Sequence, residues 1–594
     1  MSETETHRRR SGTNTRSRSG PIFVGDFDDD DFDVVIVGSG FGGSVSAYEL
    51  ASRGARVCVL ERGKAFPPGS FGRTPSELAR NLWDPSEGLH GMFNVWSFKG
   101  IDALTASGLG GGSLIYANVM LRKDPSWFVQ RHPYRKDETE SWPIGYADLE
   151  PHYQAVETFL DVQTVPEAAD VPKLAALEGA AQEMGMRDEF HRAPLAVRFR
   201  GPGGSFIPGE PLAADDYPSI FGDGGRARRT CRLCGECDVG CNDGAKNTLD
   251  HTYLSAAAHR GAVISIRSEV TALRRRDGRF EVEFVVHDPE REGRKTDTGA
   301  LPPRVLTASR VVLAAGAIGS TYLLLRNRTS LGIANPALGT RFCGNGDLLG
   351  FILKSERDGE PFPLEGSKGP VISSYIRWPD GVDTNSPDDF GIYLEDAGFP
   401  AFMQWLVEAT QVRATVTRAA KFTVARIKER FTGQRKSLLS GELSQLLGEG
   451  VLSRSSLPLL AMGRDVPDGR LYLDGDESKW LDCTWTTKTS KAYFDHVQAQ
   501  MKKVSDALRG RMEVNPHYLL NRVITVHSLG GSPMSDEPDQ GVVDRFGQVH
   551  GVAGLYVADG AVMPGPVGPN PSLTIAAFAR WMCEQMPVEQ AVAR

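Results

Sequence analysis

The segment from residue 33 to residue 61 constrains the fold of this chain more than any other. An apolar run at residues 33–37 leads into Gly38, Gly40 and Gly43, a helical pattern follows, and a second apolar run at residues 57–60 ends at Glu61. Strand, glycine turn, helix and strand in this order predict a βαβ unit.

The spacing of the three glycines is G-x-G-x-x-G, which gives each glycine a separate role. The first permits a tight turn, the second lets a diphosphate approach the backbone, and the third lets the helix pack on the strand. The helix start offers free N–H groups and the positive end of the helix dipole. Glu61 stands where a carboxylate accepts ribose hydroxyls, so we expect a dinucleotide without a 2′-phosphate. The segment alone leaves NAD and FAD open.

Length and charge restrict the class of protein. With 594 residues the chain exceeds one core, so we expect two or more domains built from discontinuous segments. The net charge of −8 argues against nucleic acid as a partner. Residues 1–26 are polar and predict a disordered tail without an export signal. We therefore expect a cytoplasmic protein with reduced cysteines.

Four cysteines lie within eleven residues. Cys231, Cys234, Cys237 and Cys241 have the spacing C-x₂-C-x₂-C-x₃-C, which is that of bacterial iron–sulfur proteins. An iron–sulfur cluster, a zinc site and four free thiols all remain open from the sequence. A cluster near a redox cofactor would pass electrons singly to an acceptor.

A basic amphipathic stretch occupies residues 412–436. It predicts either peripheral contact with an anionic membrane or a surface helix packed on the protein. Elsewhere, residues 263–288 alternate around Asp277–Gly278 and predict a β-hairpin, and residues 142–160 predict a turn followed by a helix.

Four segments together resemble the glucose–methanol–choline (GMC) oxidoreductase family, and most closely its bacterial cholesterol-oxidase branch. They are the glycine turn above, SGLGGGSLIYANVMLR (107–122), WPIGYADLEPHY (142–153), and the pair VHSLGGSPMS (526–535) with GLYVADGAVMPGPVGPNPSLTIAAFA (554–579). The resemblance implies an α/β fold in which a discontinuous Rossmann-like FAD-binding domain adjoins a substrate domain, an antiparallel β-sheet covered by helices. It places the FAD-binding domain at residues 27–150, 243–345 and 520–594, and the substrate domain at residues 151–242 and 346–519.

The same resemblance implies the cofactor and its site. FAD is expected to bind non-covalently, because residues 101–109 lack the histidine that covalent members carry. The implied cofactor-binding residues are Gly38, Gly40, Gly43, Glu61, Gly110, Gly111, Gly112, Ser113, Asn118, Val270, Gly316, Asp559 and Gly560.

The implied catalytic residues are His527, Asn570 and Glu395. His527 matches the family's proton acceptor, Asn570 the carboxamide that binds the substrate oxygen, and Glu395 the acid that moves a proton during steroid isomerisation. The expected reaction is oxidation of an alcohol, with a 3β-hydroxysterol as the expected substrate and oxygen or an electron carrier as acceptor. Two alternatives remain: a dehydrogenase of another alcohol, and a non-catalytic flavin electron-transfer protein.

Overall fold

The computed structural model describes residues 22–587 except 26, 136–137, 223–225, 387–388, 402–453 and 475–479. Almost all of the expected tail and the whole basic stretch 412–436 lie outside the described residues. Among the described residues, no helix is both long and apolar enough to cross a membrane.

The βαβ unit predicted from the glycine pattern forms the centre of the larger sheet. β2 (Asp31–Val37) pairs in parallel with β3 (Val57–Leu60) on one side and with β14 (Arg304–Leu313) on the other. β25 (Leu555–Val557) also pairs in parallel with β14, at the end of that strand (residues 311–313). The last four residues of β2 are buried, as expected for a parallel strand covered on both faces. The strands in spatial order are β1 (Ile22–Phe23), β11 (Val263–Ser265), β3, β2, β14, β13 (Arg279–Val286) and β12 (Ser268–Arg276).

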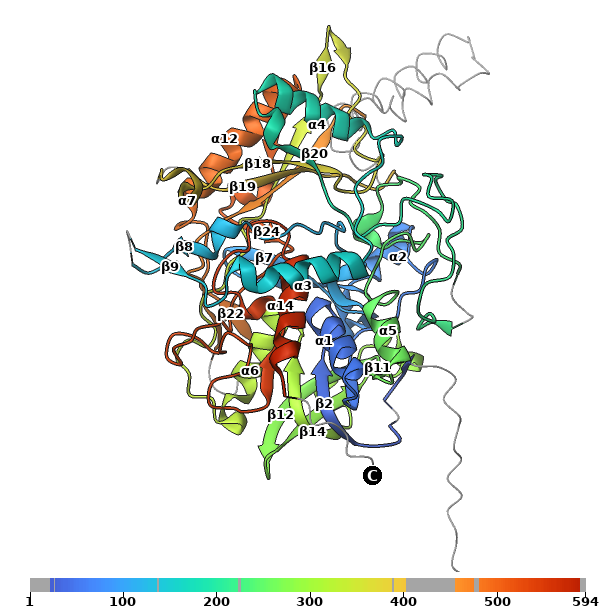
Figure 1. Cartoon of the computed structure of the whole chain (residues 1–594), viewed down its shortest axis with the longest axis vertical. Helices are drawn as coiled ribbons and strands as arrows, with labels where there is room; N and C mark the ends of the chain where they lie inside the picture. Colours follow the sequence, from blue (N-terminus) through green and yellow to red (C-terminus); the bar gives the residue numbers. More distant parts are fainter. Residues whose placement is uncertain are drawn as a thin grey trace, which may run out of the picture.

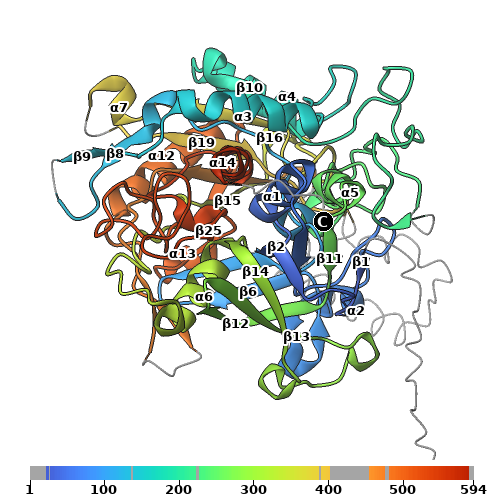
Figure 2. The same cartoon turned by 60° about the horizontal axis from the view of Figure 1, so that its bottom comes forward.

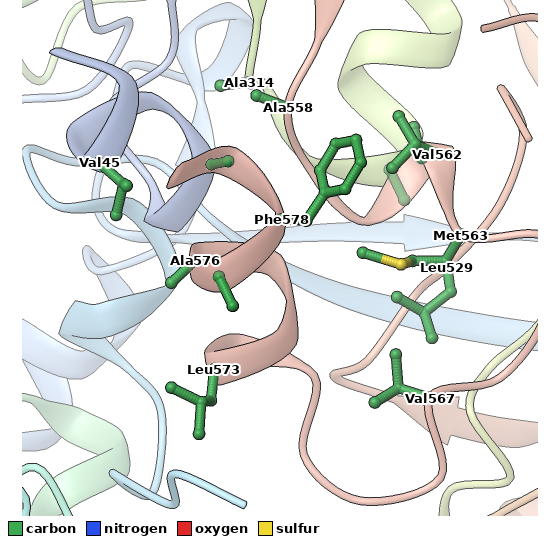
Figure 3. Close-up of a cluster of buried hydrophobic side chains, with 14 of the residues drawn as sticks. Val45, Ala314, Leu529, Ala558, Val562, Met563, Val567, Leu573, Ala576 and Phe578 are labelled. Atoms are coloured by element: carbon green, nitrogen blue, oxygen red, sulfur yellow. The ribbon is translucent and has the colours of Figure 1, made fainter. Parts of the chain in front are cut away.

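Helices from both ends of the chain pack together beside this sheet (Figures 1 and 2). α14 (Ser572–Gln585) lies between α1 (Phe41–Ser52) and α3 (Tyr146–Phe159), with α5 (Tyr253–His259) on the far side of α1 and α6 (Gly316–Leu331) against β12. Figure 3 shows the apolar side chains of α14 in this core, together with Val45 of α1.

A second sheet of six antiparallel strands lies above the first in Figure 1. α4 (Pro172–Glu183) and α12 (Lys491–Ala507) pack on it. Its strands in spatial order are β10 (Phe190–Arg192), β18 (Ser374–Trp378), β19 (Ile392–Asp396), β20 (Leu457–Gly463), β15 (Leu348–Leu353) and β23 (Arg511–Val514).

A small three-stranded sheet lies between the two larger ones (Figure 1). It consists of β24 (Val523–Thr525), β7 (Ile101–Ala106) and β6 (Phe93–Ser97). The remaining elements are short: β4 (Trp83–Asp84), β5 (Leu89–His90), β8 (Val129–Arg131), β9 (Thr139–Ser141), β16 (Glu356–Arg357), β17 (Glu360–Pro361), β21 (Leu471–Leu473), β22 (Leu481–Cys483), α2 (Pro75–Ala79), α7 (Gly381–Thr384) and α13 (Pro516–Leu519).

The predicted fold class is confirmed, and so are the local elements. β12 and β13 form the expected hairpin, and its two turn residues, Asp277 and Gly278, have φ of 51° and 81°, as a tight two-residue hairpin turn requires. α3 begins at Tyr146, directly after the predicted turn. The domain boundaries stay a prediction.

A buried ion pair joins α4 to the second sheet. Lys173 and Asp396 are both fully buried, with Nζ 4.0 Å from the Asp396 carboxylate. Lys173 also donates to the Pro370 carbonyl at 2.7 Å, and Asp396 accepts from the Ser373 and Ser374 N–H groups. Burial lowers the pKa of Lys173 and raises the pKa of Asp396, so the pair holds its charges at a cost in solvation.

Replacing one partner of this pair should destabilise the protein strongly. Lys173→Met leaves a buried carboxylate without its cation, and we expect the free energy of unfolding to fall by about 3–5 kcal/mol. Lys502→Met, which removes an exposed partner of Asp506 on α12, should cost less than about 1 kcal/mol. Thermal denaturation in excess FAD compares the two variants; equal effects would contradict the assignment.

Candidate active site

The glycine turn between β2 and α1 is as close-packed as its sequence predicts. A Cβ on Gly43 would lie 2.0 Å from the Gly38 carbonyl oxygen, so only glycine permits this approach of helix to strand. Gly38 has φ of 96°. A Cβ on Gly40, by contrast, would meet no protein atom within 4 Å among the described residues. Gly40 therefore borders space that a ligand can fill.

Ser39, which the motif leaves unspecified, joins this turn to two other segments. Its hydroxyl donates to Glu61 at 2.6 Å and accepts from the Gly110 N–H at 3.0 Å. The other Glu61 oxygen accepts from Gly63 N–H at 2.8 Å. Val270 lies in β12, two residues after Ser268, whose N–H donates to the Glu61 carbonyl. The predicted cofactor-binding residues Glu61 and Val270 thus both lie around the end of β3.

The glycine-rich loop meets the first turn directly. A Cβ on Gly111 would lie 2.7 Å from Gly40 Cα, whereas a Cβ on Gly112 would meet no protein atom within 4 Å in the described structure. The Ser113 hydroxyl donates to the Gly110 carbonyl and accepts from Leu249 N–H, so it holds the loop in shape.

Asn118 follows this loop and is fully buried with φ of 72°. Neither polar atom of its carboxamide has a hydrogen-bond partner among the described residues, and the same is true of the Tyr116 hydroxyl. Buried polar groups nearly always have a hydrogen-bond partner, so we expect these groups to bind a polar ligand. The space at Gly40 and Gly112 and these free groups fit FAD.

Asp559 joins the two strand ends on the other side of β2. Its carboxylate accepts from Gly316 N–H at 2.9 Å, from Ala561 N–H at 2.9 Å and from the Ser320 hydroxyl. Burial raises the pKa of Asp559 to about 6. The next residue, Gly560, accepts at its carbonyl from Gly530 N–H. This contact links the segment to the strand region that carries His527.

His527 follows β24, and its ring is paired with a residue that the sequence did not single out. Nδ1 lies 2.8 Å from the carboxylate of Asp347, whose side chain is 1% exposed. Asp347 lies directly before β15 in the pattern Asn-Gly-Asp, which by itself predicts only a turn.

Asn570 and Glu395 lie near each other from different parts of the chain. Asn570 ends a fully buried loop at residues 561–570, and Glu395 lies in β19 with no exposed area. Burial raises the pKa of Glu395 well above its usual range, and Asn570 partly offsets that effect while Asp347 adds to it. Three side-chain oxygens here lack a hydrogen-bond partner within the described residues: both of Glu395 and the Oδ1 of Asn570. Glu395 thus lies close to Asn570 and within electrostatic reach of Asp347, the partner of His527.

Two buried side chains support the Asn570 loop. Lys123 donates from Nζ to the Pro566 and Val567 carbonyls at 2.9 and 3.1 Å. Asn345 bonds the backbone of Gly568. No periodic pattern in the sequence marks either residue, since both act through contacts distant along the chain.

The four cysteines are not arranged as a metal site in the described part of the chain. All four thiols are free, and burial raises the pKa of Cys231, Cys234 and Cys237, for Cys234 to about 12. In the parts of the chain that the structure covers, no group of three or more His, Cys, Asp or Glu side chains is placed to hold a metal ion. The expectation of an iron–sulfur cluster on Cys231, Cys234, Cys237 and Cys241 is therefore withdrawn.

Comparisons with known proteins identify relatives along most of the chain. Residues 225–344 and 466–579 each match a family model described as GMC oxidoreductase, and residues 33–184 match one described as FAD dependent oxidoreductase. The chain is 31% identical to a cholesterol oxidase of Mycobacterium tuberculosis (strain ATCC 25618 / H37Rv) over 92% of its length and 90% of the relative. It is 26% identical to a cholesterol oxidase of Acinetobacter baumannii, over 94% and 95% of the two chains.

A solved structure shows the same fold. The crystal structure of pyridoxine 4-oxidase from Mesorbium loti superposes with a TM-score of 0.55 at 16% identity, and covers 93% of this chain and 98% of that one. The chain therefore belongs to the GMC oxidoreductase family and is an FAD-dependent enzyme that oxidises the CH–OH group of alcohols.

Proposed function

We propose that this enzyme oxidises a 3β-hydroxysterol such as cholesterol to the ketone and then isomerises the steroid double bond. The similarity to two proteins named cholesterol oxidase supports the substrate class. The observation that carries the proposal is Glu395, a fully buried carboxyl group close to Asn570 whose oxygens have no hydrogen-bond partner among the described residues. Oxidation of an alcohol by a flavin does not require a second acid. Isomerisation of a double bond in an apolar substrate does, because a proton must be moved from one carbon to another.

The residues that would hold FAD lie in the two glycine turns, at the end of β3, in β12, and where Asp559 contacts Gly316. They are Gly38, Gly40, Gly43, Glu61, Gly110, Gly111, Gly112, Ser113, Asn118, Val270, Gly316, Asp559 and Gly560. In this proposal Glu61 accepts the ribose hydroxyls, and the free amide of Asn118 bonds the polar edge of the flavin.

The bound flavin supplies a hydride acceptor for the alcohol carbon. His527 takes the hydroxyl proton at Nε2, because Nδ1 is engaged with Asp347. The Asn570 carboxamide bonds the substrate oxygen and keeps it beside the imidazole. Glu395 then takes a proton from C4 of the ketone and returns it at C6, so no net charge is gained or lost.

The cofactor site can be tested by filling its empty space. Gly40→Ala adds a methyl group where no atom of the described residues lies within 4 Å and where φ is −70°, so the fold should survive. If a diphosphate lies there, FAD affinity of the apoprotein should fall about tenfold or more, which is about 1.4 kcal/mol. Gly179→Ala on α4, equally free of neighbours, serves as the control. Fluorescence titration with FAD measures both variants, and unchanged affinity for Gly40→Ala would exclude this placement.

The substrate and the base can be tested together by anaerobic bleaching of the flavin. We expect cholesterol to bleach the enzyme faster than a linear primary alcohol, a hexose or an amino sugar. His527→Ala should slow bleaching by the best substrate about 100-fold or more, because a general base is lost. Bleaching by another alcohol alone would disprove the sterol assignment, and undiminished bleaching in the variant would disprove the role of His527. Admission of oxygen or of a dye then identifies the acceptor.

The isomerisation can be separated from the oxidation. Glu395→Gln keeps the shape of the protonated acid but cannot carry a proton, so it should yield the unshifted ketone while oxidation continues. Because burial raises the pKa of Glu395, the wild-type group starts protonated at low pH and can accept the C4 proton only as the carboxylate. The isomerised share of product should therefore rise with pH. Glu513→Gln, an exposed change in β23 of the same sheet, is the control. Chromatography of the products measures the ratio of shifted to unshifted ketone. Full isomerisation by Glu395→Gln would disprove the role of Glu395.

A further inference from the structure

The loop before β15 contacts both segments that carry the proposed catalytic pair. We propose that Asn345 and Asp347 are positioning residues that fix the protonation of His527 and its register with Asn570. The inference rests on the proposed roles of His527 and Asn570, and it adds how their geometry and proton state are set.

Asp347 determines which nitrogen of His527 carries the proton. One carboxylate oxygen lies 2.8 Å from Nδ1, and the other accepts from Val526 N–H and from the Thr525 hydroxyl, both at 2.9 Å. An ionised carboxylate only accepts hydrogen bonds, so Nδ1 must donate. In the neutral ring Nε2 then carries no proton. It can therefore accept the proton of the substrate hydroxyl group.

The same contact stabilises the charge that develops during the reaction. When Nε2 takes the hydroxyl proton, the ring becomes an imidazolium whose Nδ1–H faces Asp347. The His527 side chain is 12% exposed and that of Asp347 is 1% exposed, so water screens this attraction only weakly. Asp347 therefore favours the protonated product of the step as well as the starting tautomer.

Asn345 fixes the other half of the pair. It is fully buried with φ of 54°, and its Nδ2 lies 3.1 Å from the carbonyl oxygens of both Gly568 and Pro569. Its Oδ1 accepts from Gly568 N–H at 2.9 Å. These hydrogen bonds hold the two residues directly before Asn570, so two neighbouring side chains of one loop locate His527 and Asn570.

Three further contacts hold the loop itself. Asp465 accepts from Gly344 N–H at 3.0 Å, and the Thr525 hydroxyl approaches the Gly344 carbonyl at 3.1 Å. Tyr493 donates to the Gly346 carbonyl at 2.9 Å, and a Cβ on Gly346 would lie 2.3 Å from that hydroxyl. The loop is thus anchored from β24 and α12 independently of the cofactor.

The decisive variant is Asp347→Asn. Its amide can donate to Nδ1, which favours the tautomer with a proton on Nε2 and so removes the base. We expect the rate of anaerobic flavin reduction by cholesterol to fall about 100-fold or more, with the KM changed by less than about threefold. If cholesterol does not bleach the flavin, the probe is the alcohol of the panel that bleaches it fastest, so failure of the sterol assignment remains distinguishable from failure of this proposal.

A double-mutant cycle separates positioning from general damage. If Asp347 acts through His527, adding Asp347→Asn to His527→Ala should slow flavin reduction no further. Asp544→Asn makes the same chemical change at a carboxylate that also accepts backbone N–H groups, from Phe546 and Gln548, and it should leave the rate unchanged. A rate for Asp347→Asn within threefold of wild type, or full additivity with His527→Ala, would overturn the proposal.

A second variant covers the case in which Asp347→Asn fails to fold. Asp347→Ala, purified with formate, leaves room for a small carboxylate beside Nδ1. Added formate should restore flavin reduction in this variant at least tenfold and should not do so in His527→Ala. Rescue in both variants, or in neither while FAD is retained, would contradict the role of Asp347.

Discussion

The hydroxyl of Ser39 joins the segments around which the rest of the molecule is arranged. It lies between the first glycine turn, the end of β3 and the glycine-rich loop, donating to Glu61 and accepting from Gly110. Because Gly111 and Gly40 approach each other so closely, the two turns leave no room for side chains between them. The proposed FAD-binding space is a consequence of this contact, since its border consists of backbone and a carboxylate already fixed by hydrogen bonds.

The proposed catalytic region follows a different plan, in which no single element carries the chemistry. His527 follows β24, Glu395 lies in β19 of the six-stranded sheet, and Asn570 ends a buried loop before α14. The segments that carry His527 and Asn570 meet at the loop before β15, which contacts them through Asp347 and Asn345. The loop at residues 345–347 spans this meeting point, which is why a polar loop can remain buried there with its groups satisfied.

The sequence predicted what local chemistry determines. The βαβ unit follows from apolar periodicity and glycine spacing, and the β12–β13 hairpin follows from Asp277–Gly278. The pairing of His527 with Asp347 joins residues 180 positions apart, and the contact of Asn345 with Gly568 joins residues 223 apart, so no local pattern announces them. The cysteine spacing shows the opposite failure: the motif is present, but the backbone of the described residues does not bring three or more metal-ligating side chains together there.

The parallel pairing of β25 with β14 has a consequence for biosynthesis. During translation, β2 and β14 emerge long before β25, which completes one flank of the sheet and brings Asp559 to Gly316. A ribosome-bound chain thus presents an open backbone edge at Val311–Leu313 that only a much later segment covers. The contact of Asp559 with Gly316, and the segment that leads to Asn570, can therefore form only after this late strand has been made.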